Sequence, residues 1–357
     1  MEKTQTDAGR AQRRNARDLV TAGNEVVLAL DYLTRREFMA HQARCLGMIL
    51  GAVAFGERRP RVATPDCSYA WVDMPVLNDD SVFEVWTCAQ PVVREDAGGL
   101  ASAGNEDILF GCLQIKQDCR LDAATFIAYS RIFDFIDRRG YCHLLRVWNY
   151  IPQIHADEDG LERYARFNVG RHDAFTAKRR VIGMDAPAAS ALGSRGTDLV
   201  IYFLAARKPG QVVENPRQTS AFNYPAQYGP RSPTFARAML MQTAGTPQLF
   251  ISGTASIVGH ATLHRGDVTA QAQETVANIL AVIAQARRTG LDAADPNAEL
   301  LLKIYLRHAG DLAAVRHCLL QTFGAATNAV YLRADICRAD LLMEVEAVYP
   351  TVRVPLH

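Results

Sequence analysis

Residues 246–259 read TPQLFISGTASIVG, and the rest of the chain is interpreted outward from this stretch. The run 249–257 mixes apolar and small residues, as a strand buried on both faces does. Gly253 lies inside it, and a glycine within a strand often marks the close approach of another backbone or a ligand. A Gly-Asp pair then supplies a turn and an N-cap, and apolar residues recur at helical spacing over 267–288. The stretch therefore predicts a buried strand, a turn and an amphipathic helix.

The composition of the chain is ordinary for a soluble globular protein. The 357 residues are enough for two domains with cores of their own, and 49% are apolar and 22% charged. The net charge of +1 gives no reason to expect a nucleic-acid surface. The sequence has no apolar run long enough for a membrane span and no signal-peptide core at its start. The eight cysteines include no Cys-x-x-Cys pair, so we expect no metal site and reduced thiols in a cytoplasmic protein.

The order strand, helix, strand, helix occurs twice, over 107–178 and over 247–323. In the first copy the helix predicted at 121–140 has Asp122 as its N-cap and Gly140 as its stop. Residue identity between the copies is low, so the repeat is one of pattern. We expect an α+β fold of two tandem domains, each a mixed β-sheet with two helices packed on one face.

Composition also suggests where the domains begin and end. The Gly-, Ala- and Pro-rich segment 183–196 predicts a boundary, which gives an N-terminal domain at 23–182 and a C-terminal domain at 183–357. Residues 1–22 are polar with mixed charges and are expected to form a disordered tail. Residues 91–106 are rich in glycine, alanine and acidic residues and are expected to form a loop.

The stretch 246–288 resembles the signature of the RidA/YjgF-like superfamily, a strand with Ser-Gly followed by a Gly-Asp turn and a helix that begins with spaced glutamines. Residues 334–347, ADICRADLLMEVEA, resemble the last strand of that fold, which ends in Glu-aliphatic-Glu-Ala. The resemblance implies two tandem RidA/YjgF-like domains. Ligands of such proteins lie in clefts between neighbouring domains, so a tandem chain could form such a cleft within itself.

The linking region is similar to a narrower group. Residues 215–218 read NPRQ, 221–225 read AFNYP, 228–238 read YGPRSPTFARA, and 146–152 read RVWNYIP. Over roughly residues 110–350 the chain resembles the chorismatase family. Members of this family remove the enolpyruvyl group of chorismate without a metal or organic cofactor, so the resemblance implies that none is needed. One branch hydrolyses chorismate to a diene diol, and other branches form 3-hydroxybenzoate, alone or with 4-hydroxybenzoate.

Two positions match the 3-hydroxybenzoate branch. The catalytic acid of the family is a glutamate near the C-terminus, and in this branch a cysteine precedes it by seven residues, as Cys337 precedes Glu344. The branch also has glycine where the hydrolytic branch has alanine in the Ser-x-Thr-Ala-Ser strand, and this chain has Gly253. The resemblance therefore implies Glu344 and Cys337 as catalytic residues.

The pattern alone leaves these roles open. Strand alternation places Glu344 and Glu346 on one face, where two carboxylates repel and one can retain its proton near pH 7. Without the resemblance, a solvated face with two surface glutamates would be preferred. With it, Glu344 is the expected acid and the role of Glu346 is open. Cys337 is either a buried structural thiol or a contact for an intermediate, with Arg338 lowering its pKa.

A substrate with two carboxylates requires cationic partners, and arginine binds carboxylate with two parallel hydrogen bonds. Arg237 is the first choice, because it lies in a strand of apolar neighbours, whereas most arginines are solvated. Tyrosines could bind the ring hydroxyl of the substrate or pack in the core. The other expected substrate-binding residues are Arg146, Arg163, Arg231, Tyr150, Tyr224, Tyr228, Gly253 and Ala255.

Three functions remain. The first is conversion of chorismate to 3-hydroxybenzoate, with or without 4-hydroxybenzoate, and pyruvate by acid-catalysed cleavage of the enol ether. The second is hydrolysis to the diene diol and pyruvate. The third is a RidA-like imine deaminase or small-molecule binding module, in which Arg333 or Arg338 would bind the ligand. Chorismate is the expected partner, with no nucleic acid and no membrane, and the protein is expected to be a monomer or a homotrimer.

Overall fold

The computed structural model describes residues 28–45, 47–60, 68–79, 81–242, 247–291, 300–325 and 327–349. The tail expected at residues 1–22 lies outside these ranges. In the described part of the chain, no helix is both long and apolar enough to cross a membrane.

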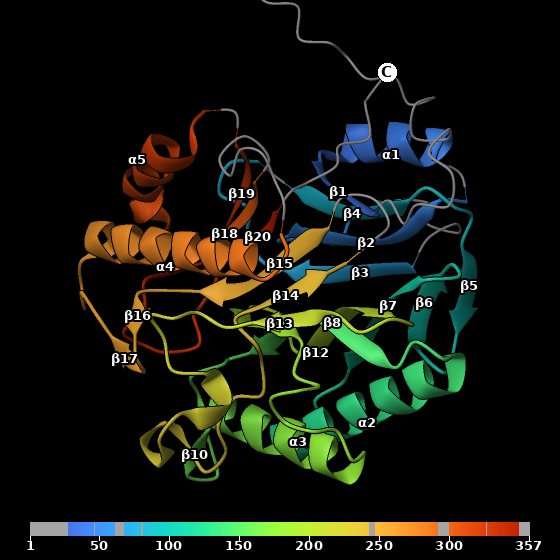
Figure 1. Cartoon of the computed structure of the whole chain (residues 1–357), viewed down its shortest axis with the longest axis horizontal. Helices are drawn as coiled ribbons and strands as arrows, with labels where there is room; N and C mark the ends of the chain where they lie inside the picture. The colour runs from blue at the N-terminus through green and yellow to red at the C-terminus, as the bar shows by residue number, and fades with distance from the viewer. Residues whose placement is uncertain are drawn as a thin grey trace, which may run out of the picture.

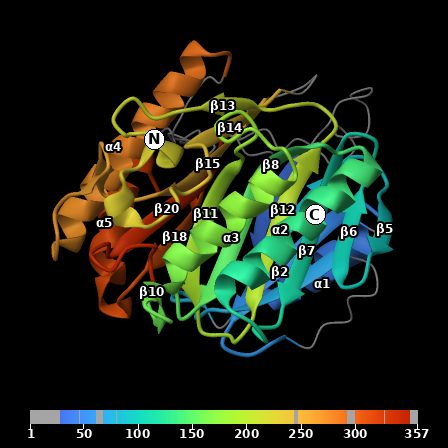
Figure 2. The same ribbon diagram turned by 90° about the horizontal axis from the view of Figure 1, so that it is seen from below.

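The first of two larger sheets is mixed, with the strand order β11-β8-β12-β7-β6-β5. β11 and β8 are parallel and the other neighbours antiparallel. Helices α2 (Leu121–Arg139) and α3 (Arg163–Ala177) cover one face, as Figure 2 shows. Its strands are β5 (Val93–Asp96), β6 (Leu100–Gly104), β7 (Ile108–Ile115), β8 (His143–Pro152), β11 (Ala188–Ser194) and β12 (Leu199–Ala206).

The second larger sheet has the order β13-β14-β15-β20-β18-β19, with only the last pair parallel. Helices α4 (Val268–Arg288) and α5 (Leu312–Phe323) cover one face of it. The side chain of Asp267 caps α4 by accepting a hydrogen bond from the Ala270 amide at 3.0 Å, as predicted. Its strands are β13 (Gln211–Val213), β14 (Ala238–Met241), β15 (Gln248–Thr254), β18 (Leu301–Leu306), β19 (Asn328–Arg333) and β20 (Met343–Tyr349).

The two sheets are copies of one topology. Read from β5, the first sheet has the order β5-β6-β7-β12-β8-β11, which corresponds strand by strand to the order β13-β14-β15-β20-β18-β19 of the second. In each sheet only the last pair of strands is parallel. Each copy carries two helices on one face, so the predicted α+β class with tandem units is confirmed.

Three local predictions are wrong. β11 and β12 were assigned to the second domain, but they pair with β8 and β7, so the break expected between residues 182 and 183 falls inside the first unit. The segment 91–106, expected to be a loop, contains β5 and β6. Asp122 does not cap α2; the N-cap is Arg120, without a side-chain bond. Pairing between strands far apart in sequence decides the first case, whereas in the second case β5, β6 and β7 form consecutive hairpins that the local composition does not indicate.

A third sheet precedes these units, although it was expected to be part of the first domain. Its order is β1-β4-β2-β3, with β2 and β3 parallel, which repeats the order β7-β12-β8-β11 of four strands in the first larger sheet. Thr34 and Glu37 form a capping box at the start of α1 (Arg35–Arg44), which was not predicted. The strands are β1 (Leu28–Leu33), β2 (Ile49–Gly56), β3 (Ser68–Asp73) and β4 (Val82–Cys88).

The three sheets enclose one core. β3 lies against β7, β11 against β15, and β1 against β19. Figure 1 shows the helices on the outside of the molecule, with α1, α4 and the α2–α3 pair on different sides of the strands. Buried residues from all three sheets meet inside, among them Trp86, Trp148 and Phe250. Two short hairpins, β9 (Asp157–Glu158) with β10 (Leu161–Glu162) and β16 (Ile257–Val258) with β17 (Ala261–Thr262), complete the strands.

Candidate active site

A cavity of about 530 Å³ lies where the two larger units meet. The first unit contributes the start of α3 and the residues before it, and the second contributes β15, β20 and the segments that precede β14 and β20. Its lining residues include Tyr164, Ala165, Gln218, Tyr224, Tyr228, Phe235, Arg237, Gly253, Ala255, Cys337, Arg338, Asp340 and Glu344. The cleft between domains within one chain, which the sequence suggested, is therefore present.

Glu344 reaches the cavity from the second position of β20 and is only 4% exposed. Burial raises the pKa of its carboxyl group to about 8, and the carboxylate of Glu346, two residues further along the same face, adds to the shift. Arg146 and Arg237 oppose the shift but do not cancel it. The side chain is therefore an acid that holds its proton at neutral pH.

Gly253 makes room for this acid. A Cβ atom at this position would overlap Glu344 Oε1 and lie 2.7 Å from its Cδ. The Gly253 amide donates a hydrogen bond to Ser190 Oγ at 3.0 Å, which fixes β15 against β11. The close approach predicted for Gly253 is thus to the acid itself, across adjacent strands of one sheet.

Cys337 lies beside the acid as a neutral thiol. Its Sγ is 3.9 Å from Glu344 Oε2. Burial and, after it, the charge of Glu344 raise the pKa of the thiol to about 12. Arg338 lowers this pKa, as expected, but its effect is smaller than those of burial and Glu344, so the net shift is upward. Burial in an apolar wall outweighs one neighbouring charge here.

Two arginines present unused hydrogen-bond donors. Arg237 Nη2 donates to Thr219 O at 2.6 Å and to Tyr224 Oη at 2.7 Å. Arg338 Nη1 donates to His260 O at 2.9 Å, and its guanidinium carbon lies 4.0 Å from the ring centre of Tyr228. Within the described residues, the buried Nε of Arg237 and Nη2 of Arg338 have no hydrogen-bond partner.

Buried cationic donors without partners are costly unless a ligand supplies acceptors. Because Arg237 and Arg338 both line the cavity, they suit a ligand with more than one carboxylate.

The structure brings together some of the expected site residues. Glu344, Cys337, Arg237 and Gly253 line the cavity, and so do Ala255, Tyr224 and Tyr228. The hydroxyl of Tyr228 donates to His260 O at 2.7 Å, and that of Tyr224 accepts from Arg237. Both tyrosines therefore hold the cavity wall and the arginines in place.

Four expected substrate-binding residues lie elsewhere. Arg146 is buried behind the cavity and pairs with Glu346 at 2.7 Å. The hydroxyl of Tyr150 lies in the central core, 2.9 Å from that of Tyr305. Arg163 holds the start of α3 through Pro152 O, Glu158 and Gln117. Arg231 is exposed. These residues do belong to the segments that the motifs identify. A motif in a strand or a loop, however, does not show which of its side chains faces the cavity.

Arg338 and Tyr164 are site residues that the sequence analysis did not assign to the substrate. Arg338 was considered only as a neighbour of Cys337 or as the arginine of a deaminase. Tyr164 lies beside Cys337 and Glu344, whose charges, after burial, raise the pKa of its hydroxyl. Arg338 follows Cys337 in the sequence, and Tyr164 follows Arg163. Because Cys337 and Arg163 were both expected at the site, their neighbours could have been considered as well.

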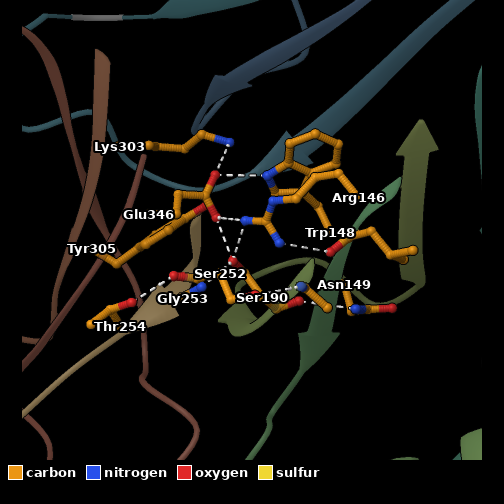
Figure 3. Close-up of polar contacts among 12 residues, drawn as sticks. Arg146, Trp148, Asn149, Ser190, Ser252, Gly253, Thr254, Lys303, Tyr305 and Glu346 are labelled. Atoms are coloured by element: carbon orange, nitrogen blue, oxygen red, sulfur yellow. Dashed lines mark hydrogen bonds and ion pairs between the residues drawn. The ribbon is translucent and has the colours of Figure 1, made fainter. Parts of the chain in front are cut away.

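Glu346 does not line the cavity. Its carboxylate lies in a buried polar network, shown in Figure 3. Its Oε1 accepts hydrogen bonds from Trp148 Nε1 and from Lys303 Nζ, both at 2.7 Å. Its Oε2 accepts from Arg146 at 2.7 Å and from Ser190 Oγ at 2.5 Å. Burial alone would raise the pKa of Glu346, but Lys303 and Arg146 outweigh it and hold this pKa below its usual range.

A protonated buried carboxyl group beside two guanidinium groups defines an enzyme that can bind a small polyanion and transfer a proton to it. The sequence model described as "Chorismatase FkbO/Hyg5-like, N-terminal" matches residues 84–205.

Curated relatives match over most of the chain. A protein named chorismatase from Streptomyces rapamycinicus is 38% identical over 292 residues, covering 79% of this chain and 86% of the relative. A protein named 3-hydroxybenzoate synthase from Streptomyces hygroscopicus is 36% identical over 286 residues, covering 78% and 84%. The crystal structure of a chorismatase at 1.08 Å resolution superposes with a TM-score of 0.84 and 32% identity, covering 91% of this chain and 99% of the other. The chain belongs to the chorismatase family.

Proposed function

We propose that the protein converts chorismate to 3-hydroxybenzoate and pyruvate, with Glu344 as the acid that protonates the enol ether. The observation that carries this proposal is the position of Glu344, protonated near neutral pH, in a cavity that also holds two arginines with unused donors. A relative 36% identical over 84% of its length is named 3-hydroxybenzoate synthase, which supports the choice of product.

The chemistry begins at the methylene carbon of the enolpyruvyl group. Glu344 donates its proton to this carbon, which leaves an oxocarbenium ion at the neighbouring carbon and a carboxylate on the enzyme. Either water or the hydroxyl group of the substrate can intercept the cation. The atoms of 3-hydroxybenzoate and pyruvate together are those of chorismate, so the internal route consumes no net water, whereas hydrolysis to the diol consumes one. The ring later loses a proton, which offsets the proton that Glu344 donated.

The binding groups suit this substrate. Arg237 and Arg338 would each take one of the two carboxylates of chorismate, and the rings of Tyr224 and Tyr228 would wall the cavity. Cys337, a neutral thiol next to Glu344, is placed to contact the intermediate after protonation. We place the reaction in the cytoplasm, where thiols such as Cys337 stay reduced.

Incubation of the purified protein with chorismate, followed by chromatography of the aromatic products and enzymatic assay of pyruvate, tests the proposal. We expect 3-hydroxybenzoate and pyruvate in equal amounts, with 4-hydroxybenzoate as a possible minor product. The diene diol as main product would favour the hydrolytic alternative, and no consumption of chorismate would refute the proposal.

Cys337→Ala tests the contact with the intermediate in the same assay. We expect the product mixture to move towards the diol or the 4-isomer by more than chorismate consumption falls. A product ratio equal to that of the parent would show that Cys337 only packs against the wall.

A further inference from the structure

Four buried charges meet where the three sheets face one another. This axial cluster consists of Glu84 on β4, Arg146 on β8, and Lys303 and Glu346 on β18 and β20. None of the four side chains is more than 6% exposed, and their formal charges sum to zero. None of the four lines the cavity.

Lys303 is shared between two carboxylates. Its Nζ lies 2.7 Å from Glu346 Oε1 and 2.5 Å from Glu84 Oε2. Glu84 is otherwise satisfied by neutral donors, Trp86 Nε1 at 2.8 Å and the hydroxyl of Tyr202 at 3.0 Å. Glu84 therefore places a second negative charge beside Lys303, so that these two residues together bring no net positive charge to Glu346, which has Arg146 as its other cationic partner.

The charge of Glu346 acts on Glu344 and raises the pKa of its carboxyl group. The two glutamates share one face of a buried strand, so their interaction is weakly screened. Replacing a buried ion pair with apolar residues is often neutral or stabilising, so stability gives little reason to retain this cluster. The arrangement of its charges instead bears on whether Glu344 keeps its proton.

We propose that Glu84, from the N-terminal sheet, is a positioning residue that acts through Lys303 and Glu346 to keep the carboxyl group of Glu344 protonated. The inference rests on the proposed role of Glu344 as the acid. It assigns the N-terminal sheet a part in catalysis, although the described residues of that sheet contribute nothing to the cavity wall.

Other ionisable groups also face the acid from the elements around it. After burial, Glu346 is the largest cause of the raised pKa of Glu344, and Arg146, Cys337 and Arg237 oppose it. Asp340 is paired with Arg265 at 3.1 Å. Burial raises the pKa of Tyr164 in the cavity wall, so this tyrosine stays neutral. The same holds for the buried tyrosines around the axial cluster, which are Tyr32, Tyr150, Tyr202 and Tyr305. The charged and titratable groups that line the cavity with Glu344 are Glu162, Tyr164, Tyr224, Tyr228, Arg237, Cys337, Arg338 and Asp340.

The test is the pH at which Glu344 loses its proton, measured in variants of the axial cluster. Glu84→Gln removes one negative charge and keeps the shape, so the midpoint should fall by about one pH unit, the size of a shift expected from one nearby charge. Lys303→Met removes a positive charge and should move the midpoint upward. Glu84→Gln combined with Lys303→Met removes one charge of each sign and should return the midpoint towards that of the parent.

Two readouts give this midpoint. One is the alkaline limb of kcat/KM for chorismate. The other is the infrared carbonyl band of the protonated carboxyl group, assigned by its loss in Glu344→Gln, which does not require turnover. Glu57→Gln is the matched control, because Glu57 is an exposed carboxylate at the end of the same N-terminal sheet and should shift neither readout.

The outcomes separate the two proposals. The infrared midpoint could fall in Glu84→Gln, rise in Lys303→Met and return in the double variant while the protein does not consume chorismate. That result would support the role of the axial cluster and refute the proposed function. A midpoint unchanged in Glu84→Gln, with chorismate turnover intact, would overturn the inference alone. Should Glu84→Gln fail to fold, the difference between the double variant and Lys303→Met still measures the effect of Glu84.

Discussion

Glu344 and Glu346 lie two residues apart on one strand and are in opposite protonation states. Lys303 and Arg146 hold the pKa of Glu346 low against its burial, whereas burial and the resulting Glu346 charge raise that of Glu344 to about 8. The separation arises from which donors each carboxyl group reaches, since both are buried to the same extent. In the proposed mechanism, this separation makes Glu344 the proton donor and Glu346 a fixed charge.

The first prediction concerns the acid. Glu344→Gln keeps the size of the side chain but removes the transferable proton, so turnover of chorismate should fall by about two to four orders of magnitude. The parent should lose activity as the pH rises through about 8, because the acid must be protonated. Steady-state kinetics from pH 6 to 10 measure both, with circular dichroism as the control for folding. Activity that rises through pH 8 would contradict this role.

The second prediction concerns the dianion. Arg237→Ala should weaken chorismate binding by roughly 2–4 kcal/mol, the loss of a charged hydrogen-bond donor in a buried site. Arg231→Ala is the matched control, because Arg231 belongs to the same segment but is exposed. Isothermal titration of chorismate into each variant, made in a Glu344→Gln background to prevent turnover, gives the affinities. Equal affinities for the two variants would show that Arg237 only supports the wall.

At the scale of the elements, β15 and β20 place the acid. Their pairing is interrupted between Ile251 and Thr254, and Gly253 occupies the interruption, where the carboxyl group of Glu344 fills the space of a side chain. The sequence predicted a close approach to Gly253 by another backbone or a ligand, whereas the structure places the side chain of Glu344 there. Which strand pairs with β15 is a long-range contact that a glycine pattern does not reveal.

The third prediction follows from this packing. Gly253→Ala would force Glu344 to move, because the new methyl group overlaps its Oε1. We expect turnover to fall at least about tenfold, since a displaced acid loses its alignment with the substrate. We also expect a larger share of diol among the products. Product analysis together with a crystal structure of the variant checks this, and an unmoved Glu344 with parental kinetics would contradict it.

Element prediction succeeded where local signals are strong. The helix α4, with Asp267 as its cap, and the end of α2 at Gly140 follow from sequence alone. β11 was missed because its Ala- and Ser-rich sequence reads as a linker, although β8 and β15 bury it on two sides. Arg146 was placed at the substrate for a related reason. Strand periodicity defines two faces but does not say which of them meets a cavity and which a core.

At the scale of the whole molecule, three sheets of related topology close around one core within a single chain. The inner sheet faces are therefore covered, and the outer faces carry helices. Large exposed apolar side chains in the described residues are scattered over several elements: Met39, Val93, Phe126, Ile127, Val181, Met184, Leu280 and Leu320. Among the described residues, one copy of the chain supplies both the core and the cavity wall.

The last prediction is therefore that the protein is an active monomer. Monomeric soluble proteins seldom expose a large contiguous apolar patch, and the dispersal of these side chains agrees with that pattern. Light scattering after size-exclusion chromatography should give a mass near 39.3 kDa. Because the cavity is built from two units of one chain, specific activity should stay constant on dilution from micromolar to nanomolar protein. A mass near three times that of the chain, together with activity lost on dilution, would show that the site depends on contacts between chains.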